Sequence, residues 1–338
     1  MKSKIILGLT FVLAILIVIN LNKSEPQEVV IYVSHDQDYS EPILQAFEKE
    51  SGIKVKAVYD TEASKTVGLT NRLISEKNNT QADVFWNNEV TRTIQLQKEG
   101  VLTQYYPQNY EKISAEFKDV DGYWTGFAAR ARVLVVNKEN LASKDYPVNL
   151  EDLTKSIYKN QVTLADPRFG TTGSHLAALY TLWGETKTFQ YLRDLKSNGL
   201  NIAQSNGQTR DKVVNGEMLI GFTDTDDAYD SVKENKPVDV IYPNPEDIGT
   251  LVIPNTAMLI KGSPNEKNAK LLIDYLVSST SEILLARSKA VQIPLIANTD
   301  LPDGLPSLAN LKPMTINWNQ VTDNLEPVLS FVEAELIQ

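Results

Sequence analysis

The sequence predicts an α/β protein of two lobes joined by two long strands. Apolar, β-branched segments alternate with amphipathic ones at the spacing of strands and helices over residues 28–100, and again over 161–242. This alternation is typical of a parallel or mixed sheet with helices on both faces. Two segments with strand character, 125–136 and 249–260, are long enough to run from lobe to lobe as a hinge. The length of 338 residues also favours two domains, because single hydrophobic cores seldom grow beyond roughly 250 residues.

The individual elements follow from hydrophobic periodicity and from residues typical of helix ends. Ser40 is predicted to cap the first helix and Gly52 to end it, since serine favours helix starts and glycine favours helix ends. Gly100 ends a later helix in the same way. The expected strands are 28–34, 53–60, 82–86, 125–136, 161–165, 217–222, 238–242 and 249–260, and the expected helices are 40–51, 64–77, 89–99, 172–183 and 225–235, with further helices after residue 306.

The first 26 residues predict export from the cytoplasm. Lys2 and Lys4 precede an apolar run over 5–19, which has the length of a signal-peptide core and is too short for the ~30 Å hydrocarbon layer of a membrane. An Ala-x-Ala-type cleavage pattern is missing, so a cleaved signal peptide and an uncleaved membrane anchor both remain open. Both place the folded part in the periplasm or an equivalent extracytoplasmic space. The expected organisation is 1–26 as signal or anchor, 27–125 as the first part of lobe 1, 126–249 as lobe 2, and 250–338 as the return to lobe 1 with C-terminal helices.

Composition and charge exclude several classes of function. The formal net charge is −10, which would repel nucleic-acid phosphates, so no nucleic-acid partner is expected. The chain has no cysteine, which excludes disulfides, thiolate zinc sites and cysteine nucleophiles. We expect a monomer that takes a small solute or an ion.

Three polar clusters stand at the predicted carboxyl ends of strands, where open α/β sheets bind ligands. The first cluster, 34–39, could instead be a polar turn. The second, 166–175, offers hydroxyls and free N–H groups that suit an anion, and ordinary helix capping needs fewer such residues. The third, 223–227, follows an apolar strand. Candidates outside the clusters are Glu62, Trp86, Arg130 and Asn206.

The third cluster contains Asp224, Asp226 and Asp227, which repel one another unless a cation or an ammonium group lies among them. Helix capping accounts for one or two of these aspartates. The Asp-x-Asp at 224–226 also matches the metal-binding motif of a metal-dependent transferase, although no convincing nucleophile or base accompanies it. Arg130 and Arg132 fall on one face of a strand, where they either touch the ligand or pair with the acidic clusters.

Several segments, taken in order, resemble a known family. AFEKESGIKV at 46–55, ADVFW at 82–86, RARV at 130–133 and GE at 216–217 are similar to segments of the extracytoplasmic solute-binding proteins of ABC importers, in the branch of the ferric-iron-binding proteins. The resemblance extends over about residues 28–296. It implies a type II periplasmic-binding-protein fold that closes on its solute like a Venus flytrap. It also implies delivery to an ABC permease, no enzymatic activity and no required cofactor.

The resemblance further implies roles for single residues. His35 and Tyr39 lie in the family's first-strand region, Thr172, Gly173 and Ser174 resemble its anion cradle, and Asn206 resembles the cradle asparagine. The adjacent tyrosines that ligate ferric iron in the family are replaced here by Asp226 and Asp227.

Carboxylates remain hard oxygen ligands for Fe(III) or a divalent cation with a synergistic anion. They suit equally the ammonium group of an amino-phosphonate, whose acid end would lie at 171–174, so iron and an amino-phosphonate or phosphate-containing solute both stay open. The full set of expected ligand-binding residues is His35, Tyr39, Glu62, Trp86, Arg130, Thr171, Thr172, Gly173, Ser174, Asn206, Asp224, Asp226 and Asp227, with Asp226, Asp227 and His35 as candidate metal ligands.

Overall fold

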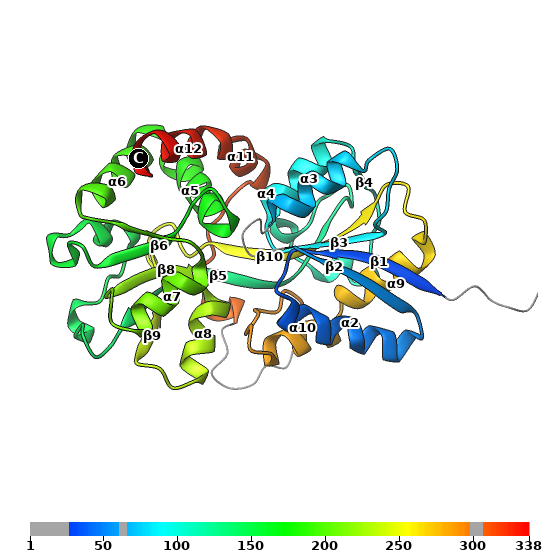
Figure 1. Cartoon of the computed structure of the whole chain (residues 1–338), viewed down its shortest axis with the longest axis horizontal. Helices are drawn as coiled ribbons and strands as arrows, with labels where there is room; N and C mark the ends of the chain where they lie inside the picture. The colour runs from blue at the N-terminus through cyan, green and yellow to red at the C-terminus, as the bar shows by residue number, and fades with distance from the viewer. Residues whose placement is uncertain (1–26, 61–65, 298–306, 338) are drawn as a thin grey trace, which may run out of the picture.

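The computed structural model describes residues 27–60, 66–297 and 307–337. Two α/β lobes lie side by side, and strands β5 (Thr125–Asn137) and β10 (Val252–Ile260) run between them (Figure 1). The predicted two-lobe arrangement is therefore present. Within the described part of the chain, no helix is both long and apolar enough to cross a membrane.

The first lobe is built on strands β2, β1 and β3, which run parallel, with β10 added antiparallel to β3. Strands β1, β3 and β10 are mostly buried, whereas β2 at the edge is not, and the helices between the strands cover both faces of the sheet (Figure 1). The elements are β1 (Glu28–Val33), α2 (Gln37–Ser51), β2 (Lys54–Tyr59), α3 (Val67–Ser75), β3 (Val84–Asn87), α4 (Val90–Lys98), β4 (Leu102–Thr103), α9 (Glu266–Leu276) and α10 (Ser279–Arg287).

The second lobe continues the sheet in the order β5, β8, β6, β7, with β9 pairing to the other edge of β5. Strands β6, β7 and β8 run parallel, and β5 is antiparallel to β8. The elements are β6 (Val162–Ala165), α5 (Gly170–Trp183), α6 (Glu185–Ser197), β7 (Asn201–Ala203), α7 (Asn206–Val214), β8 (Ile220–Asp224), α8 (Thr225–Lys233) and β9 (Val238–Ile241). Short 3-10 turns lie at Tyr110–Lys112, Ala115–Phe117, Ser143–Asp145, Leu150–Thr154, Ser156–Tyr158 and Leu308–Asn310.

Strand β5 belongs to both lobes, because its first half pairs with β10 and its second half pairs with β8 and β9. At the crossing, Ala128 has a φ of 40°, and the register with β10 shifts between Pro254 and Asn255. The buried Glu282 of α10 holds this irregular backbone by accepting the N–H of Ala128 at 3.0 Å. The predicted boundaries at 27–125, 126–249 and 250–338 stay predictions, since a shared strand cannot be assigned to one lobe.

The C-terminal helices run from the junction of the lobes, where α11 lies, over the second lobe (Figure 1). Helix α11 (Trp318–Asp323) packs against both α4 and α5, and α12 (Leu325–Phe331) packs against α5. A π-helical turn at Val332–Leu336 follows. Lys98 of α4 forms an ion pair with Asp323 of α11. Helices were expected after residue 306, and this prediction is confirmed.

Two of the predicted boundaries that differ from the structure do so for local reasons. Helix α2 begins at Gln37 with Asp36 as its N-cap residue, so Ser40 lies inside the first turn and donates its hydroxyl to the Asp36 carbonyl at 2.8 Å. Strand β8 begins at Ile220 rather than at 217, because Gly216 has a φ of 74° and the chain is still turning there.

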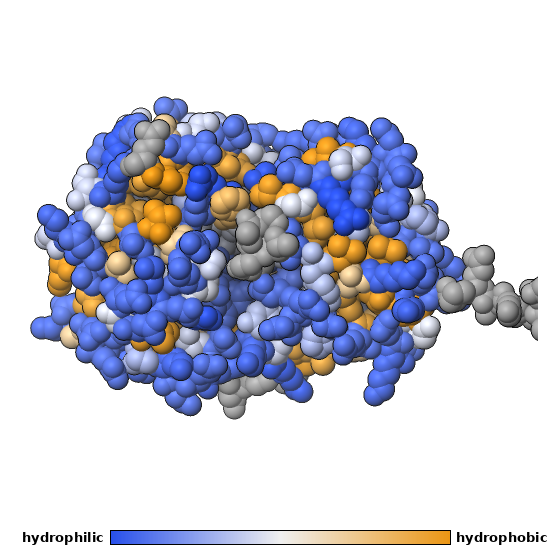
Figure 2. All heavy atoms as spheres, in the orientation of Figure 1, coloured by the Kyte–Doolittle hydropathy of each residue, from blue (hydrophilic) through white to orange (hydrophobic). Residues whose placement is uncertain are grey.

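The surface facing the viewer in Figure 2 is mainly hydrophilic, with hydrophobic residues in smaller groups over both lobes. A mainly polar surface suits a protein that folds in water.

Candidate solute-binding cleft

A polar cleft lies between the lobes and is lined by the starts of helices from both. Asp36, Thr66 and Asn88 come from the first lobe, at the starts of α2, α3 and α4. The carboxyl ends of the parallel strands β6, β7 and β8 deliver the second lobe's residues to the same edge, as expected for open α/β sheets. These residues are Ala165, Asp166, Phe169, Gly170, Thr171, Gln204, Ser205, Asn206, Gly207, Asp224, Asp226 and Asp227, and Arg130 of β5 completes the lining.

The cleft has a volume of about 110 Å³. A single water needs only ~10–15 Å³. The space therefore suits a small organic molecule or an ion together with companion groups, and exceeds what one bare ion would fill.

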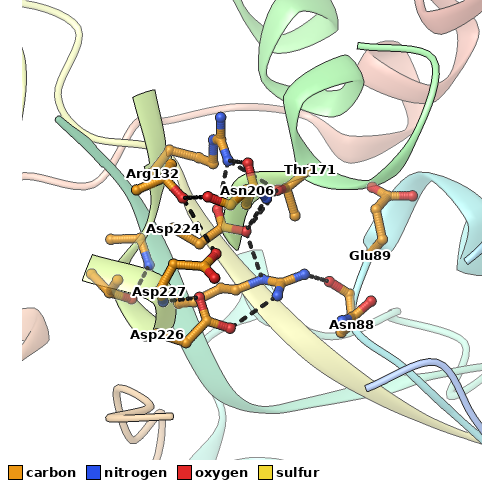
Figure 3. Close-up of polar contacts among 12 residues, drawn as sticks. Asn88, Glu89, Arg132, Thr171, Asn206, Asp224, Asp226 and Asp227 are labelled. Carbon is orange, nitrogen blue, oxygen red and sulfur yellow. Dashed lines mark hydrogen bonds and ion pairs between the residues drawn. The ribbon is translucent and has the colours of Figure 1, made fainter. Parts of the chain in front are cut away.

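Asp224, at the end of β8, is held by a network of hydrogen bonds (Figure 3). Arg132, which is fully buried, donates to the Asp224 carboxylate at 2.8 Å. Thr171 donates its hydroxyl to the same carboxylate at 2.7 Å, and the Asn206 amide donates at 2.9 Å. Arg132 also donates to the Thr171 hydroxyl at 3.0 Å and to the Asn206 side-chain oxygen at 3.1 Å. Asp224 therefore joins the starts of α5, α7 and α8 into one rigid wall.

Arg130 carries a second positive charge into the cleft wall. Its guanidinium lies 3.2 Å from an Asp226 oxygen and 3.6 Å from an Asp224 oxygen. It also donates to the main-chain oxygen of Asn88, in the other lobe, at 2.7 Å. Burial alone would raise the pKa of Asp224, but the charges of Arg132 and Arg130 hold that pKa below its usual value. The cation expected among the aspartates is thus supplied in part by the chain itself.

Among the three aspartates, Asp227 has a negative charge that nearby positive groups offset least. Burial and the negative charges of Asp226 and Asp224 raise its pKa well above the usual value, although Arg210 offsets part of the effect. Its carboxylate accepts the Thr223 hydroxyl at 3.3 Å. One oxygen each from Asp224, Asp226 and Asp227 can be chosen so that all lie within 4.8 Å of one another. Arg130 and Arg132 form ion pairs with Asp224 and Asp226, and no ion pair to Asp227 is found among the described residues, so a further positive charge would be favourable there.

Tyr39 of α2 belongs to the same electrostatic environment. Burial, followed by the charges of Asp226, Asp230, Asp227 and Asp36, raises its pKa. A ferric ion ligated by Tyr39 would therefore have to displace a proton that is held more tightly than in an ordinary tyrosine.

The start of α5 offers an uncapped helix end to the cleft. Phe169 occupies the N-cap position without a side-chain hydrogen bond, and Gly170 and Thr171 follow it in the lining. Free N–H groups and the positive end of the helix dipole favour an anion at such a position. Phe169 is 39% exposed and is the one large apolar side chain among the residues described around the cleft.

Three residues of the expected anion cradle lie behind the cleft wall. Thr172 accepts a hydrogen bond from Arg132 at 3.2 Å, and Ser174 donates to Glu89 at 2.5 Å. Gly173 packs closely, because an added Cβ would lie 2.3 Å from the Pro167 carbonyl oxygen. Of the second cluster, Asp166, Phe169, Gly170 and Thr171 line the cleft, whereas Thr172, Gly173 and Ser174 do not.

The first cluster is also displaced relative to the prediction. His35 is buried beneath the cleft, with its ring 5.6 Å from the Trp86 ring and 5.8 Å from the Tyr39 ring. Trp86 is fully buried and donates its indole N–H to Asn255 at 3.1 Å. Neither His35 nor Trp86 is part of the lining, and Asp36 takes the place expected for His35. Glu62 lies outside the described residues.

Sequence reasoning missed several lining residues. Asp36 belongs to the first cluster, 34–39, but neither Asp36 nor Asn88 was among the expected ligand-binding residues. Phe169 and Gly170 belong to the second cluster but precede the predicted helix start by two or three residues, and neither was among the expected ligand-binding residues. Gln204, Ser205 and Gly207 belong to a helix start that was not predicted.

Two α/β lobes that place helix starts around a polar cleft define a binding protein that encloses a small solute. The chain belongs to the family described as bacterial extracellular solute-binding proteins, whose model matches residues 81–324. Iron uptake protein A1 of Synechocystis is 26% identical over 315 residues, covering 90% of this chain and 85% of that protein. A putative 2-aminoethylphosphonate-binding periplasmic protein of Salmonella typhi is 25% identical over 303 residues, covering 88% and 83%. Iron-bound HitA from Pseudomonas aeruginosa superposes with a TM-score of 0.83 at 23% identity, covering 91% of this chain and 99% of that one.

Family membership settles the class of function. The protein has the type II periplasmic-binding-protein fold and is a non-enzymatic solute-binding component of an ABC importer. The folded part of the chain works outside the cytoplasm. The reading as a metal-dependent transferase is unsupported.

Proposed function

We propose that the solute carries a phosphate or phosphonate group at one end and an ammonium group or hydroxyls at the other. The observation that carries this proposal is that one cleft is lined both by the uncapped start of α5 and by Asp226 and Asp227 of α8. Groups that attract an anion and groups that attract a cation thus face the same small volume.

The acid end of the solute binds at the start of α5. The backbone N–H groups of Gly170 and Thr171 are free of intrahelical partners there, as at the first turn of any helix. Asn206 and Gly207, at the start of α7, line the same side of the cleft. Two helix starts with their positive dipole ends stabilise the charge of a phosphate or phosphonate group.

The positive or hydroxylated end binds at Asp226 and Asp227. An ammonium group there would lower the raised pKa of Asp227 by supplying the missing positive charge. Sugar-type hydroxyls would donate hydrogen bonds to the same oxygens. The exposed ring of Phe169 contacts the carbon skeleton between the two ends, which a bare ion lacks.

Ferric iron with a synergistic anion is the second candidate. The proximity of the three aspartate oxygens and the relatedness to iron-binding proteins support it. Arg130 between two of these carboxylates and the raised pKa of Tyr39 favour the organic solute. A ferric complex held by Asp226 and Asp227 would lack the red colour of tyrosinate ligation.

Isothermal titration calorimetry with four defined probes tests the proposal. The probes are 2-aminoethylphosphonate, a sugar phosphate, inorganic phosphate and ferric citrate. We expect 2-aminoethylphosphonate or the sugar phosphate to bind most tightly, and Asp227→Asn to weaken that binding by about tenfold or more, as for removal of one side of a buried charge pair. Asp121→Asn, at an exposed loop residue, is the matched control. Tight binding of ferric citrate alone would overturn the proposal in favour of iron.

We further infer that the protein acts as a monomer that hands its solute to the permease. Residues 1–26 direct export and either are removed or anchor the protein, and they lie outside the described residues. The mass of the mature protein isolated from the extracytoplasmic fraction distinguishes the two, because cleavage would remove the apolar run at 5–19.

A further inference from the structure

A buried hydrogen bond joins the two lobes beside the cleft. Ser174, in the second turn of α5, donates its hydroxyl to the Glu89 carboxylate at 2.5 Å. Glu89 is the N-cap residue of α4 in the first lobe, and both side chains are 1% exposed. Neither residue belongs to the lining of the solute cleft. The contact therefore depends on how the lobes sit together, and it does not require a solute.

Glu89 is held in place before it meets the second lobe. Its carboxylate accepts the backbone N–H of Thr91 at 2.9 Å, the Thr91 hydroxyl at 2.5 Å and the backbone N–H of Arg92 at 2.9 Å. These three bonds lie within the first turn of α4, so they persist when the lobes separate. Ser174 donates the bond by which the Glu89 carboxylate is linked across the junction. A carboxylate that is already oriented loses little conformational entropy when it accepts that bond.

We propose that Glu89 and Ser174 form a latch that stabilises the closed arrangement of the lobes without touching the solute. Closing exchanges water on both groups for one short O–H···O⁻ bond, a type stronger than a bond between neutral groups. The latch gives the solute-free protein a measurable closed population. The solute then adds its own contacts to an equilibrium already shifted toward closure.

Arg130 provides a second contact across the junction, of a different kind. Its guanidinium joins Asp226 of the second lobe to the main-chain oxygen of Asn88 in the first. Because Arg130 lines the cleft, its contacts respond to a bound solute. The Glu89–Ser174 contact is shielded from the cleft, so the two contributions to closure can be separated by mutation.

The test measures lobe separation without any solute. The chain has no cysteine, so spin labels at Asn78→Cys in the first lobe and Lys159→Cys in the second report the distance between lobes by double electron–electron resonance. Bound solute is removed by unfolding in denaturant, dialysis and refolding. We expect both a closed and an open population in the otherwise unchanged protein. Ser174→Ala should shift the ratio toward the open form by about tenfold, as expected for a hydrogen bond to a charged group.

Ser281→Ala is the matched control, since it removes a buried serine hydroxyl from α10 without altering a contact between lobes. Glu89→Gln keeps a capping oxygen for α4 and should give a smaller shift in the same direction, which protects the test if one variant folds poorly. The latch is overturned if Ser174→Ala and Glu89→Gln leave the distance distribution unchanged, or if the unlatched and unchanged proteins are both fully open. Because no solute is added, this result is independent of the proposed ligand class.

Discussion

Arg132 is the residue on which the charge balance of the cleft depends most. It is fully buried, and its guanidinium donates to Asp224, Thr171, Thr172 and Asn206. Its planar fork reaches several acceptors at once, which a lysine ammonium on a single stem cannot reproduce. Because Arg132 stands opposite Asp224 in the pairing of β5 with β8, the sheet register itself places the two charges together.

Replacing Arg132 by methionine should destabilise the protein strongly. The change leaves Asp224 buried without its nearest positive partner, and breaking a buried ion pair in this way typically costs about 3–5 kcal/mol. Urea denaturation at pH 7 measures the loss. Arg193→Met, which breaks the exposed pair with Glu335, is the control and should have little effect because surface ion pairs contribute little. Equal and small effects of both changes would show that the Arg132 network is unimportant for stability.

For a substitution of Asp227 we predict the opposite effect on stability, and this effect depends on pH. Its pKa in the folded protein is raised, so the folded state binds the proton more tightly than the unfolded state does. The stabilisation from this proton is present below the ordinary aspartate pKa of about 3.9 and is lost as the pH rises through the raised value. Asp227→Asn does not undergo this loss. It should therefore be at least as stable as the unchanged protein at pH 7, with the advantage disappearing near pH 3.5.

Chemical denaturation of the two proteins at pH 7 and pH 3.5, in the absence of solute, measures this difference. A less stable Asp227→Asn at pH 7 would mean that attraction to Arg210 outweighs the repulsion from Asp224 and Asp226.

At the scale of elements, two glycines near helix starts differ in whether they leave room for a side chain. Gly173 has no room for a side chain, whereas a Cβ at Gly207 would meet its nearest atom at an ordinary 3.6 Å. We expect Gly173→Ala to destabilise the protein by about 1–3 kcal/mol through overpacking. Gly207→Ala, at the start of α7, should be tolerated. Thermal unfolding compares the two. If Gly173→Ala kept its stability but lost solute binding, the prediction would be contradicted. Gly173 would then be part of the binding site.

The elements themselves were largely predictable because periodicity is a local property. The alternation of apolar strands with helices located β1 to β3, β5, β6, β8, β9 and β10, each within a few residues. Helices α6, α9 and α10 were not predicted. Helix α7 also escaped prediction, because its sequence, NGQTRDKVV, is polar and has glycine in its first turn. Strand β7 has only three residues and no distinct pattern.

The direction in which each side chain points was less predictable, because it depends on where each helix begins. Helix α2 starts three residues before Ser40, which turns His35 toward Trp86 and leaves Asp36 at the cleft. The pairing of Arg132 with Asp224 joins residues 92 positions apart and follows from the sheet register. Neither fact is encoded in a short segment of sequence. The strand ends indicated the correct region, and the individual contacts needed the fold.

At the scale of the whole molecule, we expect the two lobes to move about the crossing strands when a solute binds. The irregular backbone at Ala128, held by the buried Glu282 carboxylate, marks the point where β5 changes from one lobe to the other. The solute adds contacts that exist only when both lobes surround it, so binding favours the closed form. Small-angle scattering should show a smaller radius of gyration with saturating 2-aminoethylphosphonate or sugar phosphate, whichever binds. An unchanged profile at saturation would contradict closure.

Native mass spectrometry of freshly purified protein, combined with phosphorus and iron analysis, tests the central claim most directly. The account predicts one bound small molecule per chain that contains phosphorus, is released on denaturation and is accompanied by little iron. The variant with both Asp226→Asn and Asp227→Asn should retain much less of it. Stoichiometric iron with no phosphorus-containing organic molecule, lost in the same variant, would contradict the account and assign these aspartates to a ferric site.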